Sequence, residues 1–272
     1  MVIFSRLINY FDNLIGRKMG EFIKLEKKDN IAVVTMQHSP INAANDRFYQ
    51  EITEIFDDIG ADKDFRVAVL CSAYEKYWCV GNDIKDFKDM TPYNGHVRHR
   101  LLYISFMAVY DCAVPVIAAI DGYCLGTGLA FASVCDIIFA TDRAVFGAPE
   151  INLGVIGTGK FLSRMVPQFV MRRMIYNGDK FPASELEKWG CLQIISQEKL
   201  MDAAIEQAYL TASKCPSTTR LAKEALNCIE FTDLKTGYAI EQGYSRRASA
   251  YEDYKEAQKA FFEKRASVFK GK

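Results

Sequence analysis

Four short apolar runs in the first half of the chain predict buried strands. They cover residues 31–36, 67–71, 116–120 and 137–140. The run at 67–71 is continuously apolar, which is typical of a strand that is buried on both faces. We therefore expect a sheet with at least one strand covered from both sides.

Hydrophobic residues recur at helical spacing between these strands. Residues 46–59 predict an amphipathic helix, and further helices are expected at 101–110 and 129–134. The apolar face of the first helix consists of Phe48, Ile52, Ile55, Phe56 and Ile59. Because strands and helices alternate, we expect right-handed crossovers and largely parallel pairing.

The second half of the chain has a different pattern, which is helical from residue 150 to the end. The expected helices cover residues 161–176, 185–189, 203–214, 219–229 and 248–267. The sequence thus predicts an α/β core followed by helices alone. We divide it into an N-terminal extension at residues 1–20, a core at 21–200 and a helical C-terminal part at 201–272.

Composition and charge narrow the class of protein. Of the 272 residues, half are hydrophobic and one quarter are charged, which is ordinary for a globular protein. A chain of this length can bury a hydrophobic core that needs no disulfide or metal to stabilise it. Lysine and arginine number 34, as do aspartate and glutamate, so the formal net charge is zero. A general binder of nucleic acid or membrane surfaces would show a basic excess. We expect neither partner.

Cysteine and histidine usage argues against a metal or redox site. The eight cysteines form no C-x-x-C pair, and there are three histidines. Most cysteines lie in apolar runs, which predicts buried, reduced thiols in a reducing compartment. Residues 1–18 are mildly amphipathic, and Arg6 and Asp12 interrupt any signal-peptide core. A surface helix is favoured there over a poor transit peptide, and we expect a cytoplasmic protein.

Two glycine motifs fail as nucleotide sites. Residues 154–160 match the G-x-x-x-x-G-K part of a phosphate loop. Phe161 then takes the place of the magnesium-binding hydroxyl, and residues 148–150 form no apolar strand. Gly126-x-Gly128 lacks the third glycine of the dinucleotide fingerprint. Nucleotide chemistry is therefore not expected.

Two glycine turns remain, each between a buried strand and a helix. They are Gly81-Asn82-Asp83 and Gly126-Thr127-Gly128. A helix that begins at such a turn presents unpaired N–H groups and the positive end of its dipole. Two N–H groups that converge would form an oxyanion hole for an enolate or a tetrahedral oxyanion. The alternative is that both turns are simply tight connections.

Five segments in order resemble the crotonase (enoyl-CoA hydratase/isomerase) superfamily. They are residues 78–84, 115–128, 135–136, 146–154 and 260–265, and the resemblance runs from about residue 22 to the C-terminus. It implies a crotonase-like α/β spiral of ββα units, a helical C-terminal part that mediates trimerisation, and a homotrimer or a dimer of trimers. It also implies an acyl-CoA thioester substrate, so that coenzyme A enters with the substrate and no separate cofactor is needed.

The resemblance also assigns roles to residues. The N–H groups of Asn82 and Thr127 would form the oxyanion hole, with Thr127 where the family usually has glycine, and Glu150 would be the acid and base. Lys264 would reach coenzyme A from a neighbouring subunit; the alternative is an exposed helix lysine. The residues implied to bind substrate or coenzyme A are Asn42, Ala43, Val80, Gly81, Asp83, Ile84, Gly126, Gly128, Ala130, Phe261 and Lys264.

One departure from the family pattern bears directly on the reaction. Hydratases of the family usually carry two glutamates, and here Ala130 stands at the first position and Glu150 at the second. One carboxylate suffices to move a proton between carbons or to activate water. The alternative role for Glu150 is a helix cap.

Three functions stay open at this point. We expect enoyl-CoA hydration or double-bond isomerisation first. Residues 110–115, 162–168, 222–227 and 241–244 are similar to a crotonase branch that includes a steroid ring-opening hydrolase. Hydrolysis of a carbon–carbon bond in a cyclic 3-oxoacyl-CoA is therefore the second expectation. A non-catalytic scaffold or RNA-binding protein is the third, and the glycine turns with Glu150 argue against it.

Overall fold

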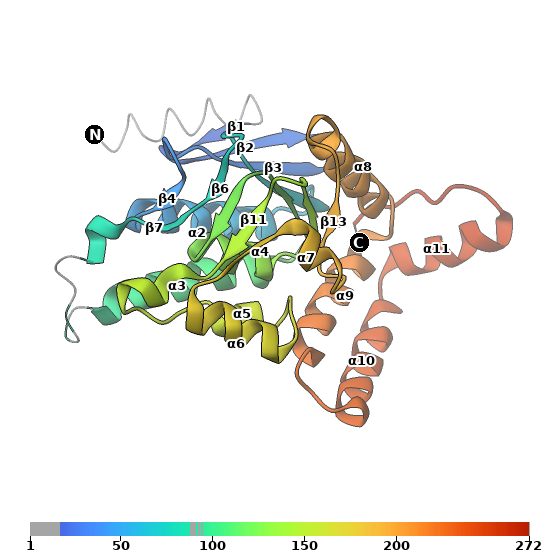
Figure 1. The fold of residues 1–272 in the computed structure, drawn as a ribbon. Helices are drawn as coiled ribbons and strands as arrows, with labels where there is room; N and C mark the ends of the chain where they lie inside the picture. The colour runs from blue at the N-terminus through green and yellow to red at the C-terminus, as the bar shows by residue number, and fades with distance from the viewer. Residues whose placement is uncertain (1–16, 88–90, 92, 94, 272) are drawn as a thin grey trace.

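A seven-stranded sheet forms the centre of the protein in the computed structural model, which describes residues 17–87, 91, 93 and 95–271 (Figure 1). Its strands, in spatial order, are β1 (Arg17–Met19), β2 (Ile23–Lys28), β3 (Ile31–Met36), β5 (Val67–Ser72), β8 (Val116–Ile120), β10 (Ile137–Ala140) and β13 (Gln193–Ile194). The first three strands pair antiparallel, and from β3 to β13 all pairs are parallel. The predicted strands and their largely parallel pairing are confirmed.

Two small sheets lie beside the large one. The four-stranded sheet contains β12 (Lys180–Pro182), β11 (Val145–Gly147), β9 (Tyr123–Leu125) and β6 (Tyr77–Cys79), and the two-stranded sheet pairs β4 (Ala43–Ala44) with β7 (Gly81–Asn82). The strands β5, β8 and β10 of the large sheet are each followed by a strand of the four-stranded sheet. The chain therefore winds repeatedly from one sheet to the other, and helices connect the turns of the winding.

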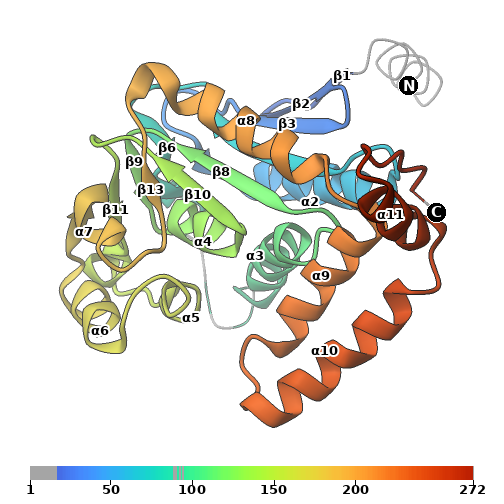
Figure 2. The same cartoon turned by 90° about the vertical axis from the view of Figure 1, so that its right-hand side faces the viewer.

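Helices cover both faces of the large sheet (Figures 1 and 2). The α-helices of the described residues are α2 (Asp46–Ala61), α3 (Gly95–Tyr110), α4 (Thr127–Val134), α5 (Gly159–Leu162), α6 (Gln168–Asn177), α7 (Ala183–Glu187), α8 (Leu200–Ala212), α9 (Pro216–Ile229), α10 (Leu234–Ala248) and α11 (Glu252–Glu263). The helices α10 and α11 extend away from the sheet beside α9 (Figure 2). The 3-10 helices are η1 (Ile84–Phe87), η2 (Pro149–Leu153) and η3 (Gln197–Lys199).

Alternating side chains of the central strands serve two separate cores. In β5, Val69 packs toward α8, and Leu70 packs toward α2, α3 and α4. In β8, Ile117 and Ala118 divide in the same way. Successive side chains of a strand point to opposite faces, so a continuously apolar strand is buried from both sides, as the sequence predicts for β5.

The start and the buried face of the helix α2 follow from its local sequence. Its start is fixed by Asn45, whose side-chain oxygen accepts a hydrogen bond from the N–H of Phe48 at 2.9 Å; this is the preferred chemistry of an N-cap. The five apolar residues expected on one face are all buried. The amphipathic pattern therefore determined both the presence and the orientation of this helix.

The second half of the chain differs from the prediction. The expected helix at 161–176 is divided into α5 and α6, because Pro167 cannot continue a helix from the preceding turn. The expectation of helices alone is wrong, since β12 pairs with β11 and β13 pairs with β10. The helix α10 was also missed. Strands this short depend on a distant partner, which no local pattern reveals.

The predicted domain boundaries stay a prediction. The helix α8, which follows the boundary near residue 200, still packs on the large sheet. Most of the predicted N-terminal extension, residues 1–16, lies outside the described residues, and residues 17–19 pair with β2 as β1. Among the described residues, no helix is long and apolar enough to span a membrane.

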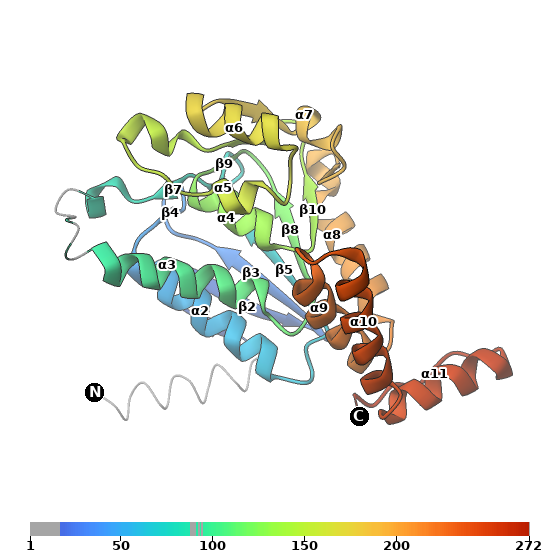
Figure 3. The same cartoon turned by 90° about the horizontal axis from the view of Figure 1, so that it is seen from below.

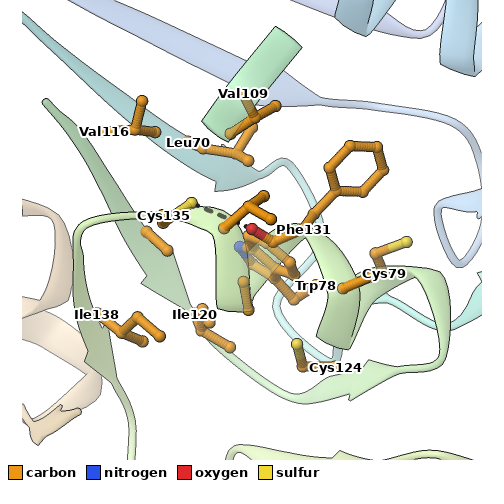
Figure 4. Packing of buried hydrophobic residues seen from close by; sticks show 14 of the residues in the cluster. Leu70, Trp78, Cys79, Val109, Val116, Ile120, Cys124, Phe131, Cys135 and Ile138 are labelled. Atoms are coloured by element: carbon orange, nitrogen blue, oxygen red, sulfur yellow. Dashed lines mark hydrogen bonds between the residues drawn. The ribbon is translucent and has the colours of Figure 1, made fainter. Parts of the chain in front are cut away.

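A dense core lies under the two glycine turns (Figure 4). Trp78 of β6 and Phe131 of α4 are fully buried, and Cys79 and Cys124 lie near them. Cys135 donates a hydrogen bond from its thiol to the carbonyl of Phe131 at 3.3 Å. All eight cysteines are free and five are buried, which confirms the expectation that most behave as small hydrophobic residues.

Candidate active site

The glycine turn at Gly126 brings the start of α4 to the edge of a cavity. Gly126 has φ +53° and ψ −115°, a conformation that side chains with a Cβ rarely adopt. Thr127 follows as the first residue of the helix. The first N–H groups of a helix have no partner within it, so the N–H of Thr127 remains available for a ligand. A threonine here is compatible with the main-chain role that the sequence analysis assigned to it.

The glycine turn at Gly81 supplies the other N–H group, that of Asn82. The N–H of Asp83 donates to the carbonyl of Ala44 in β4 at 2.9 Å. Because N–H directions alternate along a strand, the N–H of Asn82 points away from β4. The two turns touch: a Cβ on Gly126 would lie 3.5 Å from Cα of Gly81 and 3.2 Å from Oε1 of Glu150. Glycine is therefore needed at position 126 for close approach as well as for its backbone angles.

The two residues that carry these N–H groups, Asn82 and Thr127, line a cavity of about 250 Å³. Asn82, Thr127, Ala130 and Glu150, which come from distant parts of the chain, all line it. The apolar part of its wall consists of Leu102, Tyr103 and Phe106 of α3, Val155, Ile156 and Phe161. Arg98, His99, Gly157 and Thr158 complete the lining. The structure therefore brings the three predicted catalytic residues to a single site.

Glu150 is held on one oxygen and open on the other. It lies in η2, and its Oε1 accepts a hydrogen bond from the hydroxyl of Thr158 at 2.8 Å. Its Oε2 is buried and has no hydrogen-bond partner within the described residues. Thr158 has φ +45°, which is a strained backbone for a β-branched residue. An oriented carboxylate with one free oxygen can take a proton from a ligand and return it.

A buried hydrogen-bond network connects the two glycine turns. The hydroxyl of Tyr49 donates to Oδ1 of Asn82 at 2.5 Å and lies 2.8 Å from Oγ1 of Thr127. Arg98 donates to the same Oδ1 at 3.1 Å and to Asp46 at 2.7 Å. Burial raises the pKa of Tyr49 well above its usual range, so its hydroxyl stays protonated at physiological pH.

Sequence reasoning missed Tyr49, Arg98 and Thr158. Tyr49 directly follows Phe48 on the apolar side of α2, and a tyrosine in such a position usually has a partner for its hydroxyl. Thr158 lies within the glycine-rich segment that resembles a phosphate loop. Two signals in the sequence could have identified two of these residues. The polar hydroxyl on the apolar face of α2 points to Tyr49, and the glycine-rich segment that lacks a nucleotide site points to Thr158.

The other predicted ligand residues lie in different surroundings. Val80, Gly81, Asp83 and Ile84 form or flank the β7 arm, and Gly126 and Gly128 flank the α4 arm. The side chain of Asn42 is fully buried and donates to Ser72 and to the carbonyl of Trp78, each at 2.9 Å. That side chain supports the chain before β4, so a ligand would meet the main chain of this segment or Ala43.

Phe261 and Lys264 are not brought to the cavity within one chain. They lie in and directly after α11, which is on the opposite side of the molecule from α3 (Figure 3). Phe261 is 79% exposed. Within one chain, these two residues therefore do not line the cavity that contains Glu150.

A larger hollow of about 610 Å³ lies between the end of α2 and the helices α9 and α10. Two of its basic side chains are engaged within the protein. Arg220 donates to the main-chain carbonyls of Gly60, Asp62 and Phe65, and Lys223 pairs with Asp136 at 2.8 Å. The described residues contain no cluster suited to a metal ion.

Known proteins resemble this chain over most of its length. A family model described as enoyl-CoA hydratase/isomerase matches residues 26–272. A (7aS)-7a-methyl-1,5-dioxo-2,3,5,6,7,7a-hexahydro-1H-indene-carboxyl-CoA hydrolase of Rhodococcus jostii is 38% identical over 80% of this chain and 84% of its own length. A short-chain-enoyl-CoA hydratase of Clostridium acetobutylicum is 32% identical over 89% of this chain and 94% of its own.

Solved structures agree with these similarities. An enoyl-CoA hydratase from Bacillus anthracis superposes with a TM-score of 0.86 at 28% identity, over 93% of this chain and all of that one. The crotonase-like α/β fold expected from the sequence motifs is therefore confirmed.

Proposed function

The chain belongs to the enoyl-CoA hydratase/isomerase family, and from this membership we propose that its cavity binds an acyl-CoA thioester and stabilises the thioester enolate. The N–H groups of Asn82 and Thr127 would bind the enolate oxygen. Donors that are already oriented toward developing charge are commonly the largest contribution to such reactions. Coenzyme A enters as part of the substrate, and the reaction needs no metal or redox cofactor.

One observation argues against hydration and for a reaction that needs a single carboxylate. Glu150 is the single acidic side chain among the described residues that line the cavity, and Ala130 occupies the position where a second glutamate would stand. Hydration of an alkene benefits from two carboxylates, one to orient water and one to supply the α-proton. A site with one carboxylate is better suited to a reaction in which the same group takes a proton and returns it.

The reaction we favour is hydrolytic opening of a cyclic 3-oxoacyl-CoA. The similarity to a hydrolase that acts on a bicyclic oxoacyl-CoA ester supports this choice. The cavity wall also supports it, because Tyr103, Phe106 and Phe161 offer flat apolar surfaces to a compact ring system. This reverses the order of the sequence-based expectations, which placed hydration or isomerisation first.

The steps balance with water as the sole co-substrate. Glu150 takes a proton from water as the water oxygen adds to the ring ketone carbon. The bond from that carbon to the α-carbon then breaks, and its electron pair forms the thioester enolate on Asn82 and Thr127. Glu150 returns the proton to the α-carbon. One water is consumed, a carboxylic acid forms where the ketone was, and the thioester stays intact.

Mass spectrometry in heavy-oxygen water tests this proposal. The probe is 2-oxocyclohexanecarboxyl-CoA, a cyclic 3-oxoacyl thioester without an alkene, and Glu150→Gln is the matched control. We expect the wild type to add one labelled water, with the label in a new carboxylate. Turnover of linear enoyl-CoA esters without ring opening of the cyclic probe would contradict the proposal.

Double-bond isomerisation is the second candidate, favoured by the same lone carboxylate. A single base can move a proton from the γ-carbon to the α-carbon or in the reverse direction through the enolate. The same experiment separates the two reactions. Isomerisation would shift the double bond of an enoyl-CoA at unchanged mass and would leave the cyclic ester untouched.

We also propose a homotrimer or a dimer of trimers in the cytoplasm, in which Lys264 approaches coenzyme A in a neighbouring subunit. The exposure of Phe261 and Phe262 on α11 supports an interface there. Light scattering coupled to gel filtration measures the mass of the assembly. Lys264→Ala should raise the KM for acyl-CoA with little change in kcat, and an unchanged KM would contradict the assigned role.

A further inference from the structure

Tyr49 lies directly behind the candidate oxyanion hole. It is fully buried in α2 and packs against Phe106 and Phe131, with ring centroids 6.2 Å away in each case. It does not belong to the lining of the cavity. Its hydroxyl nevertheless reaches one side chain from each arm of the hole, Asn82 of β7 and Thr127 of α4. These arms belong to separate segments of the chain.

Counting protons gives the direction of each hydrogen bond. The Oδ1 atom of Asn82 is an acceptor, and it receives one bond from Tyr49 and one from Arg98. A phenol has one proton to donate, so Tyr49 uses it on Asn82. The hydroxyl of Thr127 must therefore donate to the oxygen of Tyr49. The chain of donation runs from Thr127 through Tyr49 to Asn82.

This direction has two consequences at the cavity. The hydroxyl proton of Thr127 is already used within the protein, so the threonine offers a ligand its main-chain N–H as donor. The side chain of Asn82 is likewise held by two donors from behind. Both residues are thus clamped through their side chains, which leaves their N–H groups to face the cavity.

We propose that Tyr49 is a positioning residue of the oxyanion hole, which sets the separation and orientation of the N–H groups of Asn82 and Thr127 by hydrogen-bonding to both side chains. This inference rests on the proposed function of the cavity. It deepens that function, because it explains how asparagine and threonine side chains at the two donor positions contribute without touching the substrate.

The geometry favours a positioning role over simple stabilisation. A hydroxyl that served stability alone would need one partner, whereas this one joins the two residues whose N–H groups must converge. A rigid helix supplies it, and Arg98 bound to Asp46 adds a second anchor on the Asn82 side. Misplacement of reacting groups by about 1 Å can lower a rate by about 100-fold.

The test compares Tyr49→Phe, Thr127→Val and Thr127→Ser with the wild type, and Tyr74→Phe is the matched control. Tyr74 also loses one hydrogen bond, to the carbonyl of Gln37 at 3.0 Å. The first readout is kcat and KM with 2-oxocyclohexanecarboxyl-CoA. The second is the near-ultraviolet absorbance of the enolate formed when acetoacetyl-CoA binds, which reports stabilisation of the oxyanion without turnover.

We expect Tyr49→Phe and Thr127→Val to lower kcat by about 10- to 100-fold and to weaken the enolate signal, with KM changed less than kcat. Thr127→Ser keeps the hydroxyl and should retain most of both readouts. The double variant Tyr49→Phe/Thr127→Val should be no worse than the poorer single variant, since both break the same connection. Tyr74→Phe should match the wild type.

Failure of this inference is distinguishable from failure of the proposed function. A wild type that neither opens the ring nor forms the enolate overturns the proposed function together with the role of Tyr49. A normal wild type with an unchanged, folded Tyr49→Phe overturns the positioning role alone. If Tyr49→Phe fails to fold, the comparison of Thr127→Val with Thr127→Ser decides: equal activities overturn the inference, and loss in the valine variant alone supports it.

Discussion

The two sides of the candidate site are built in opposite ways. The oxyanion side uses a strand and a helix that rest on a dense core, and its side chains are joined through Tyr49 and Arg98. On the other side, Glu150 lies in a 3-10 helix, and its carboxylate accepts one hydrogen bond from the described residues, from the hydroxyl of Thr158. Stabilising a developing charge requires donors that do not move, whereas a proton shuttle requires an oxygen that remains free. The difference in construction follows this difference in task.

Removing the free carboxylate should have the largest effect. Glu150→Gln keeps the shape of the side chain but cannot take a proton, so kcat should fall by about 100- to 10,000-fold. Because the oxyanion side is intact, the enolate absorbance with acetoacetyl-CoA should be largely retained. Steady-state kinetics and spectroscopy check the two parts. If Glu150→Gln lowered the enolate absorbance as much as it lowered kcat, the two sides of the site would not act separately.

Gly126→Ala should damage both sides at once. The new Cβ would lie 3.2 Å from Oε1 of Glu150 and 3.5 Å from Gly81, on a backbone with φ +53°. We expect a loss of about 1–3 kcal/mol in the free energy of unfolding and a fall in kcat of about 100-fold or more, comparable to losing one oxyanion donor.

A matched control for this variant is Gly243→Ala. That glycine lies in α10, its Cβ position meets no neighbouring atom within 4 Å, and it is outside the site. The free energy of unfolding from urea denaturation and the value of kcat check both variants. Comparable values of kcat in the two variants would argue against the close approach of the two arms at position 126.

The single hydrogen bond on Glu150 should matter less than the carboxylate itself. Thr158→Ala removes the hydroxyl that donates to Oε1 of Glu150, and Thr158→Ser keeps it. Hydrogen bonds to charged groups contribute about 1.5–3 kcal/mol, so kcat should fall by about 10-fold or more in the alanine variant and little in the serine variant. Single-turnover rates measure the difference, and identical rates would exclude an orienting role for Thr158.

The smallest effect is expected at α11 and the residues after it, which are far from both sides within one chain. The guanidinium of Arg265, followed by the N–H of Val268, stabilises the carboxylate of Glu256 and lowers its pKa to about 2. A lowered folded-state pKa means that this contact stabilises the fold fully above the ordinary value of 4.5 and is lost as the pH falls toward 2.

An NMR titration of the Glu256 side-chain carboxyl carbon should therefore have its midpoint near 2. In Arg265→Ala the midpoint should move up toward the ordinary value, and kcat per subunit at neutral pH should stay unchanged. If the midpoint stayed the same in Arg265→Ala, Arg265 would not be the cause of the lowered pKa of Glu256. A fall in kcat would instead connect this segment to the site.

The sequence pointed to the residues of both sides that face the cavity, but not to the side chains that hold them, which are Tyr49 and Arg98 on one side and Thr158 on the other. Asn82 and Thr127 lie in glycine turns after strong β patterns, and these local signals survive in the structure. Glu150 was reached through a family motif. Its partner Thr158 was not, because that residue lies in an irregular segment whose glycines were weighed as a phosphate loop.

Local sequence alone determined the buried strands β3, β5, β8 and β10, the helix α2 and the positions of the glycine turns. The reason is that the spacing of apolar residues, the N-cap hydrogen bond and the backbone angles of glycine each depend on residues that are close together in the sequence. Tertiary structure alone decided the short strands of the small sheets, the meeting of Asn82, Thr127 and Glu150 at one cavity, and the bonds of Tyr49. These depend on contacts between distant segments, which form as the sheets pack and which no local pattern encodes.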